Sequence, residues 1–297
     1  MSKCLNDKQG SLLVFLGGLA WGFSGACGEY ILNNRGLSVD ILIPLRLLLA
    51  GLATLFYCKI SKIDLAFGVF KNKFHLLRLL AFGFFGIFFC QYFYFYGISL
   101  SNAAIATVIQ YTAPAFIILI VCIEERKKPN LYEILSLFFV VFGILLLATN
   151  GDFTKFAITP KALFVCSLSV IGVVCYSLIP RKLNKIYSPL PILGYAMLIM
   201  GIVLCLKEQI WNKSFYIDLN LFLAMFSVII IGTVFAFGTY MIGLNIIGAT
   251  KASLIASVEP VGAAIIAYLW LGTSLDFIQI IGFILIMSAV FLTIIRK

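Results

Sequence analysis

Residues 243–271 read GLNIIGATKASLIASVEPVGAAIIAYLWL, and this stretch decides the fold because an apolar run carries Glu259 and Pro260 near its middle. A run of this length is sufficient to cross a lipid bilayer. An ionisable side chain at bilayer depth is costly, so Glu259 is a candidate for function. The stretch therefore predicts a membrane-spanning helix with a chemically active group at its centre.

The same pattern occurs in the first half of the chain, at residues 97–125, GISLSNAAIATVIQYTAPAFIILIVCIEE. The two stretches align at a constant offset of 146 residues, which brings Pro114 onto Pro260. Ala113 stands where the second copy has Glu259. This internal similarity predicts a duplicated membrane protein in which one copy is altered at its centre.

The composition excludes an ordinary soluble domain, because 62% of the residues are hydrophobic and 11% are charged. Long apolar runs separated by short polar loops predict an all-α membrane protein. A β-barrel would instead show alternation over segments of about ten residues. We expect ten transmembrane helices, of which the seventh is the shortest. Their expected ranges are 11–32, 39–58, 77–98, 103–123, 131–148, 161–179, 191–206, 221–244, 250–271 and 277–295.

Lysine and arginine residues in the loops set the orientation. Most of the 22 Lys and Arg residues fall on the inner side when the N-terminus is placed in the cytoplasm. We therefore expect a multi-pass protein of the cytoplasmic (inner) membrane with both termini cytoplasmic. This bias accounts for the net charge of +10, so no nucleic acid is expected as a partner.

The duplication also predicts the relative direction of the two copies. Five helices separate equivalent helices, and because five is odd the copies cross the bilayer in opposite directions. The predicted repeats are residues 1–150, with helices 1–5, and residues 151–297, with helices 6–10. Two inverted five-helix repeats are typical of secondary transporters, which bind their solute near the bilayer midplane between the repeats.

Motifs for catalysis or metal binding are missing from the sequence. The eight cysteines are scattered without a CxxC pair, and there is no Walker sequence or paired His/Glu motif. We therefore expect no enzyme activity, no cofactor and no metal. The sequence leaves the oligomeric state open.

Several short motifs, in a fixed order, carry a family resemblance. They are Trp21–Gly22, Pro44-x-Arg46 with Ala50, Tyr96–Gly97, Ala103–Ala106, Pro114, Gly243, Ala249, Ala252 and Glu259–Pro260. With the helix count and the repeat length, they make the chain resemble the EamA-type ten-helix transporters of the drug/metabolite transporter (DMT) superfamily. The chain departs from that pattern at Thr273, where the family often has Glu after Gly, and at Val173, where it usually has Trp. The resemblance implies export of small polar metabolites, often amino acids or related amines and carboxylates.

Glu259 is the first candidate for solute binding or coupling. Removal from water favours the neutral form of a carboxyl group, and a group that gains and loses a proton suits exchange between the two sides of a membrane. Glu259 would equally neutralise the ammonium group of a solute. The structural alternative is a bond to a neighbouring helix or to backbone that Pro260 leaves unpaired.

Pro114 and Pro260 are candidate hinges. Each proline removes one backbone donor and disturbs a carbonyl one turn earlier, which exposes polar backbone in mid-membrane. Two equivalent kinks facing one cavity would bend together. Simple packing kinks are the alternative.

Arg46 lies near the outer end of the second helix, and Glu29 near the outer end of the first. An ion pair between Glu29 and Arg46 would line or gate the outer vestibule. The alternatives are a fixed link between the two helices, or an arginine that extends to the membrane surface.

Further candidates for a central cavity are polar and aromatic residues on several helices. Aromatic walls suit organic solutes and ammonium groups, although aromatic residues also fill cores and interfacial belts. The candidates are Trp21, Gln91, Tyr92, Tyr96, Tyr111 and Thr239.

Together these features predict a secondary transporter working by alternating access. Its expected partners are the lipid bilayer, a small polar organic solute such as an amino acid or related metabolite, and protons moving in exchange for an exported solute. One alternative is an efflux carrier for drugs or organic cations, favoured by a buried acid among aromatic residues. An alternative from another class is a receptor or scaffold that transports nothing.

Overall fold

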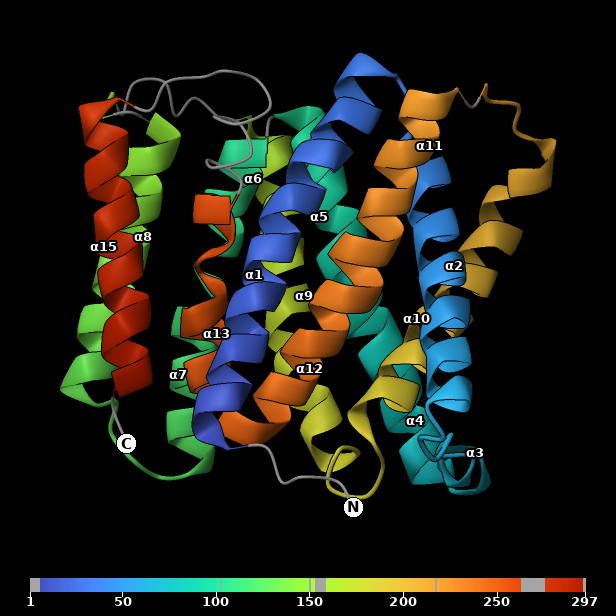
Figure 1. The fold of residues 1–297 in the computed structure, drawn as a ribbon, viewed down its shortest axis with the longest axis horizontal. Coiled ribbons are helices and arrows are strands. Elements are labelled where there is room, and N and C mark those ends of the chain that lie inside the picture. The colour runs from blue at the N-terminus through green and yellow to red at the C-terminus, as the bar shows by residue number, and fades with distance from the viewer. Residues whose placement is uncertain are drawn as a thin grey trace.

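The computed structural model describes residues 6–101, 103–149, 151–152, 159–216, 218–262 and 276–295. Within these ranges the regular structure is entirely helical (Figure 1). The helices of the first half are α1 Asp7–Glu29, η1 Tyr30–Asn34, α2 Val39–Ile60, α3 Gly68–Lys71, α4 Lys73–Ala81, η2 Phe82–Phe88, α5 Phe89–Leu100, α6 Ala103–Gln110, α7 Ala113–Glu124 and α8 Leu131–Thr149. Those of the second half are α9 Pro160–Leu178, η4 Ile179–Lys182, α10 Pro189–Glu208, η5 Ile210–Asn212, α11 Leu219–Phe226, η6 Ser227–Phe235, α12 Ala236–Ile247, α13 Ala249–Ala256 and α15 Phe277–Ile295.

The predicted helices agree with these elements to within a few residues. Among the described residues, seven helices are long and apolar enough to cross a membrane, and two shorter apolar helices lie in α8 and α15. The expectation that the seventh helix is the shortest is wrong: α10 spans 20 residues, because Pro189 and Pro191 fall within its first turn. The helix expected over 250–271 begins as α13, and its part from 263 onward lies outside the described residues.

The packing follows an inverted two-fold pattern. α2 lies against α10 and α8 lies against α15, and in each pair the two helices run in opposite directions (Figure 1). α12 of the second half packs on α1, just as α5 of the first half packs on α9. The all-α fold of two inverted repeats is therefore as predicted.

Two glycines where α2 and α10 cross make contacts that follow the same two-fold symmetry. A Cβ added at Gly51 would lie 2.5 Å from the backbone nitrogen of Leu198, and one at Gly201 would collide with the backbone of Leu48. Gly201 and Leu198 lie 150 residues after Gly51 and Leu48, so the two contacts are equivalent. Each helix therefore presents the same surface to the other. Glycine is required at both places because the backbones touch.

Among the described residues, each half contains one broken helix and one helix with a π-helical segment in its middle; a further π-helical segment, η1, continues α1. The mid-helix segments are η2, between α4 and α5, and η6, between α11 and α12. The first break separates α6 from α7 just before Pro114, and the second follows α13 just before Pro260. Both breaks arise because a proline has no N–H to donate to the preceding turn.

Figure 1 also shows the two chain ends. α1 begins and α15 ends at the same end of the bundle. An even number of crossings would produce this arrangement.

Candidate functional site

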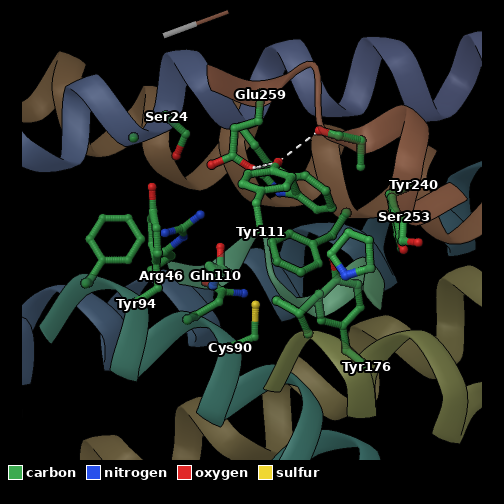
Figure 2. Close-up of a pocket in the computed structure, with 18 residues that line it drawn as sticks. Ser24, Arg46, Cys90, Tyr94, Gln110, Tyr111, Tyr176, Tyr240, Ser253 and Glu259 are labelled. Carbon is green, nitrogen blue, oxygen red and sulfur yellow. Dashed lines mark hydrogen bonds between the residues drawn. The ribbon is translucent and has the colours of Figure 1, made fainter. Parts of the chain in front are cut away.

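A cavity lies between the two halves (Figure 2). Residues from both halves line it: Trp21, Ser24, Gly25, Arg46, Cys90, Gln91, Tyr94, Phe95, Gln110, Tyr111, Pro114, Val173, Tyr176, Phe237, Tyr240, Ser253, Ala256 and Glu259. The cavity therefore joins the breaks of both halves to the helices that carry the polar side chains.

Glu259 forms the acidic wall of this cavity. Its side chain is only 8% exposed, and the hydroxyl of Tyr111 donates a hydrogen bond to its Oε2 across 2.8 Å (Figure 2). The same hydroxyl lies 2.9 Å from the backbone oxygen of Ala256. That oxygen is one turn before Pro260, which has no N–H to bond it. Tyr111 from the first half thus holds both the acid and the unpaired carbonyl of the second half.

Arg46 forms the basic wall, and the second half holds it in turn. Its Nε donates to the hydroxyl of Thr233 across 2.6 Å, and its Nη2 donates to the backbone oxygen of Gly232 across 3.2 Å. Thr233 itself donates to the backbone oxygen of Val228 five residues earlier, inside η6. The guanidinium carbon also lies 4.8 Å from the ring centroid of Phe95. The widened turn of η6 thereby supplies the acceptors for a buried cation.

Polar atoms without a protein partner gather at the cavity. Buried polar atoms are normally hydrogen-bonded, so a cluster of unbonded ones in one place indicates a binding site. The atoms in cavity-lining residues are Trp21 Nε1, Ser24 Oγ, Arg46 Nη1, Gln91 Nε2 and Oε1, and Gln110 Nε2. All except Gln91 Oε1 carry hydrogen to donate, so the cavity presents more donors than acceptors.

Aromatic rings form the wall between the charged residues and α9. The ring of Trp21 lies edge-on to Phe237 at 4.8 Å between centroids, and 5.1 Å from the ring of Tyr240. Tyr176 lies edge-on to Tyr240 at 5.4 Å. Because these rings pack on one another, they form a rigid apolar surface beside the polar groups.

The structure brings together six of the residues that the sequence singled out. Glu259, Arg46, Gln91, Tyr111, Trp21 and Pro114 line the cavity. Pro260 directly follows Glu259 at the second break. The hydrogen bond from Tyr111 agrees with the structural alternative for Glu259, a bond to a neighbouring helix. A role of Glu259 in transport is a proposal.

Three other candidates lie away from the cavity lining. Tyr92 donates to Oδ1 of Asp40 across 2.6 Å. The ring of Tyr96 lies 5.7 Å from the ammonium group of Lys161. The hydroxyl of Thr239 is bonded to backbone oxygens of its own helix. These contacts account for all three side chains without a solute.

The expected ion pair between Glu29 and Arg46 is not formed among the described residues. The guanidinium group of Arg46 points to η6, where Thr233 and the Gly232 carbonyl receive it. η1 continues α1 beyond Glu29, which leaves this acid half-buried near the end of the bundle. Arg46 is therefore a cavity residue held by the opposite half.

Sequence reasoning missed several lining residues, chiefly Tyr176, Ser24 and Gln110. Tyr94, three residues after Gln91 and on the same helix face, lines the cavity with it as that spacing predicts. Ser24 and Tyr176 hold equivalent places in the first helix of each repeat: Ser24 approaches Gly232, and Tyr176 approaches the equivalent Gly86. Aligning these helices at that shift would have pointed to Tyr176.

Fold and cavity define the class: a multi-pass helical membrane protein with a polar cavity between two inverted halves. The EamA-like transporter family matches this chain over residues 8–149 and 160–295, and the chain belongs to that family. The family and the similar proteins indicate a membrane transporter, in preference to a receptor or scaffold that transports nothing.

The similar proteins agree with this assignment. The chain is 32% identical over 287 residues to the uncharacterized inner membrane transporter YicL of Salmonella typhimurium, covering 97% of this chain and 95% of that protein. It is 25% identical to the uncharacterized transporter YyaM of Bacillus subtilis, covering 70% of each. A solved crystal structure with 16% sequence identity superposes with a TM-score of 0.78 over 95% of both chains, which supports the fold alone.

Proposed function

We propose that this transporter is a secondary carrier that exports a small polar organic metabolite, an amino acid or a related compound, by alternating access. The observation that carries the proposal is that Glu259 and Arg46 line one cavity, each bonded by the other half of the chain (Figure 2). A solute with both an anionic and a cationic group would satisfy both walls.

The basic wall suits a carboxylate. Nη1 of Arg46, both polar atoms of the Gln91 amide and the hydroxyl of Ser24 have no protein partner. Hydrogen bonds from charged donors to carboxylates are among the strongest in proteins, and Arg46 is fixed by Thr233 before any solute arrives. Such preorganisation reduces the entropic cost of binding.

The acidic wall suits an ammonium group or a proton. Glu259 accepts from Tyr111 on one oxygen, Oε2, and its carboxyl group is otherwise directed into the cavity (Figure 2). A cationic group and a proton would compete for the same carboxylate. This competition supports proton exchange, in which a proton entering from outside displaces the solute.

The two breaks support movement of the halves. Pro114 and Pro260 interrupt equivalent helices, and neither break is spanned by a continuous set of backbone hydrogen bonds. Hinges at both places would let the cavity open to one side at a time. The proposed orientation has both termini in the cytoplasm, with residues 1–150 and 151–297 as the two moving repeats.

The experiment is uptake of radiolabelled amino acids and of matched amines and carboxylates into inverted membrane vesicles, with and without a pH gradient. We expect uptake of a compound carrying both charges, driven by the gradient. Uptake of the amine and the carboxylate but not of the amphoteric compound would contradict the proposal.

The second candidate is an efflux carrier for organic cations, because Glu259 faces aromatic rings that suit a cation. The position of Arg46 in the same cavity disfavours a cation. Uptake of quaternary amines that persists in Arg46→Met would support this second candidate.

A further inference from the structure

Tyr111 has one hydroxyl hydrogen and two acceptors within reach. Oε2 of Glu259 lies 2.8 Å away and the backbone oxygen of Ala256 lies 2.9 Å away. A single O–H donates a full hydrogen bond to one acceptor at a time, so the two acceptors compete for it. The charge of Glu259 decides the competition, because an ionised carboxylate is a far stronger acceptor than a peptide oxygen.

We propose that Tyr111 is a positioning residue that links the proton state of Glu259 to the helix break beside it. When Glu259 is ionised, the Tyr111 hydrogen goes to the carboxylate and the Ala256 oxygen loses its partner. When Glu259 is neutral, its own O–H donates to the tyrosine oxygen, and the tyrosine hydrogen turns to Ala256. Only a rotation of the hydroxyl is needed, and no covalent bond of Tyr111 breaks.

The break is poorly supported without this bond. The N–H groups of Ser257 and Val258 bond three residues back, to Leu254 and Ile255, at 3.3 and 3.2 Å. Pro260 contributes no donor to the Ala256 oxygen. α1 lies against the same carbonyl, since a Cβ at Gly18 would be 3.0 Å from it. Ala256 is buried, and the Tyr111 hydroxyl is the group that satisfies its carbonyl.

The equivalent residue of the second half cannot perform this role. Ser257 corresponds to Tyr111, and its short side chain bonds the backbone oxygen of Ser253 in its own helix. The connection between the two breaks therefore runs in one direction, from the first half to the second.

Other titratable groups face the same space and belong in the account. They are Arg46 from α2, Cys90 and Tyr94 from α5, Tyr176 from α9 and Tyr240 from α12. α1 presents Gly18 to the break. Tyr94 bonds Thr107 at 2.9 Å and its hydroxyl also faces Glu259, whereas Tyr240 bonds Ser177 at 3.1 Å. Among the described residues, Tyr111 alone joins Glu259 to the break.

The test is hydrogen–deuterium exchange of peptides covering residues 249–262, measured without solute at alkaline pH. We expect Glu259→Gln, which mimics the neutral acid, to slow exchange of the break about tenfold, because one hydrogen bond is restored. Tyr111→Phe should exchange faster than the wild type. Glu259→Gln should then have no effect in the Tyr111→Phe background.

Two further variants complete the design. Pro260→Ala gives the Ala256 oxygen its own N–H donor, so Tyr111→Phe should have no effect on exchange in that background. Tyr195→Phe removes the hydroxyl of another buried tyrosine, outside the cavity, and should leave exchange of 249–262 unchanged.

The proposal is overturned if Glu259→Gln exchanges as fast as the wild type, a comparison that does not need Tyr111→Phe to fold. It is also overturned if Glu259→Gln slows exchange equally with and without the tyrosine. The role of this link in transport rests on the proposed function. Hydrogen–deuterium exchange is measured without solute, so it tests the role of Tyr111 independently of transport. If the variants exchange as expected but no transport is found, the proposed function is refuted and the role of Tyr111 is not.

Discussion

The two broken helices have the same backbone and different chemistry. α6 ends at Gln110 and α13 ends at Ala256, so both breaks lie in equivalent places before Pro114 and Pro260. Beside Pro260 stands Glu259, whereas beside Pro114 stands Ala113, which is fully buried. Proline therefore determines where each helix breaks, and the neighbouring side chain determines what the break can bind.

The charged residues of the cavity are exchanged between the halves. The first half contributes Arg46, and Thr233 of the second half holds it. The second half contributes Glu259, and Tyr111 of the first half holds it. In the hydrogen bonds described, neither charge is bonded by its own repeat, so any movement of one half relative to the other alters both.

The largest effect is expected from removing the charge of Glu259, which distinguishes the second break from the first. Glu259→Gln keeps the size of the side chain and abolishes its charge, so we expect gradient-driven transport in proteoliposomes to fall to that of empty liposomes. The matched control is Glu208→Gln, the same change at an acid paired with Lys207 and Lys213 outside the cavity. Wild-type transport by Glu259→Gln with the same pH dependence would show that the acid has no coupling role.

A smaller effect is expected from replacing Arg46 of α2, whose equivalent in α10 is uncharged. Ala196 stands in α10 where Arg46 stands in α2, given the 150-residue shift of these helices. Arg46→Met should weaken binding of an amphoteric solute about 100-fold, ~3 kcal/mol, because charged hydrogen bonds are lost. Isothermal calorimetry with the purified protein measures this. An unchanged affinity would show that Arg46 does not bind the solute.

The sequence predicted the breaks and the helices well, because prolines and apolar runs are local signals. It did not predict which face of α5 lines the cavity. η2 precedes α5, and its wider turns rotate the face that follows. Gln91 consequently faces the cavity while Tyr92 faces Asp40. The partner of Arg46 was missed for a different reason: Thr233 is 187 residues away, beyond any spacing rule.

A third prediction concerns a feature that the halves share. Gly51→Ala and Gly201→Ala should each destabilise the protein by about 1–2 kcal/mol, because each added methyl meets backbone across the same crossing. Thermal unfolding in detergent measures both. Gly238→Ala is the control, since its added methyl meets only the flexible end of Leu190. Very different losses at the two glycines would mean that the crossing is not symmetric.

The smallest effect is expected at two equivalent helix caps, neutral Asn72 before α4 and charged Asp218 before α11. The backbone N–H of Leu221 and then Arg35, at 2.6 Å, lower the pKa of Asp218. Because its pKa is lowered in the folded state, ionised Asp218 stabilises the fold when the pH is above the ordinary carboxyl pKa near 3.8. This stabilisation is lost as the pH falls through the lowered pKa of the folded state. Asp218→Asn should therefore reduce the melting temperature slightly at neutral pH and not at acid pH.

Asn72→Ser is the matched control for this comparison, because it changes the other cap without changing charge. Its effect on the melting temperature should be independent of pH. A loss in Asp218→Asn that is equal at neutral and acid pH would show that the charge of the cap contributes nothing.

The pairing of α2 with α10, and of α8 with α15, has an evolutionary consequence. In each pair a surface meets its own equivalent, which is the isologous contact of a two-fold dimer. A half-length ancestor inserted in both orientations would form these same contacts between separate chains. Fusion of two such copies into one chain would fix the ratio of the two orientations at one to one. It would also free the two copies to acquire different residues, which is a precondition for an acid in one copy alone.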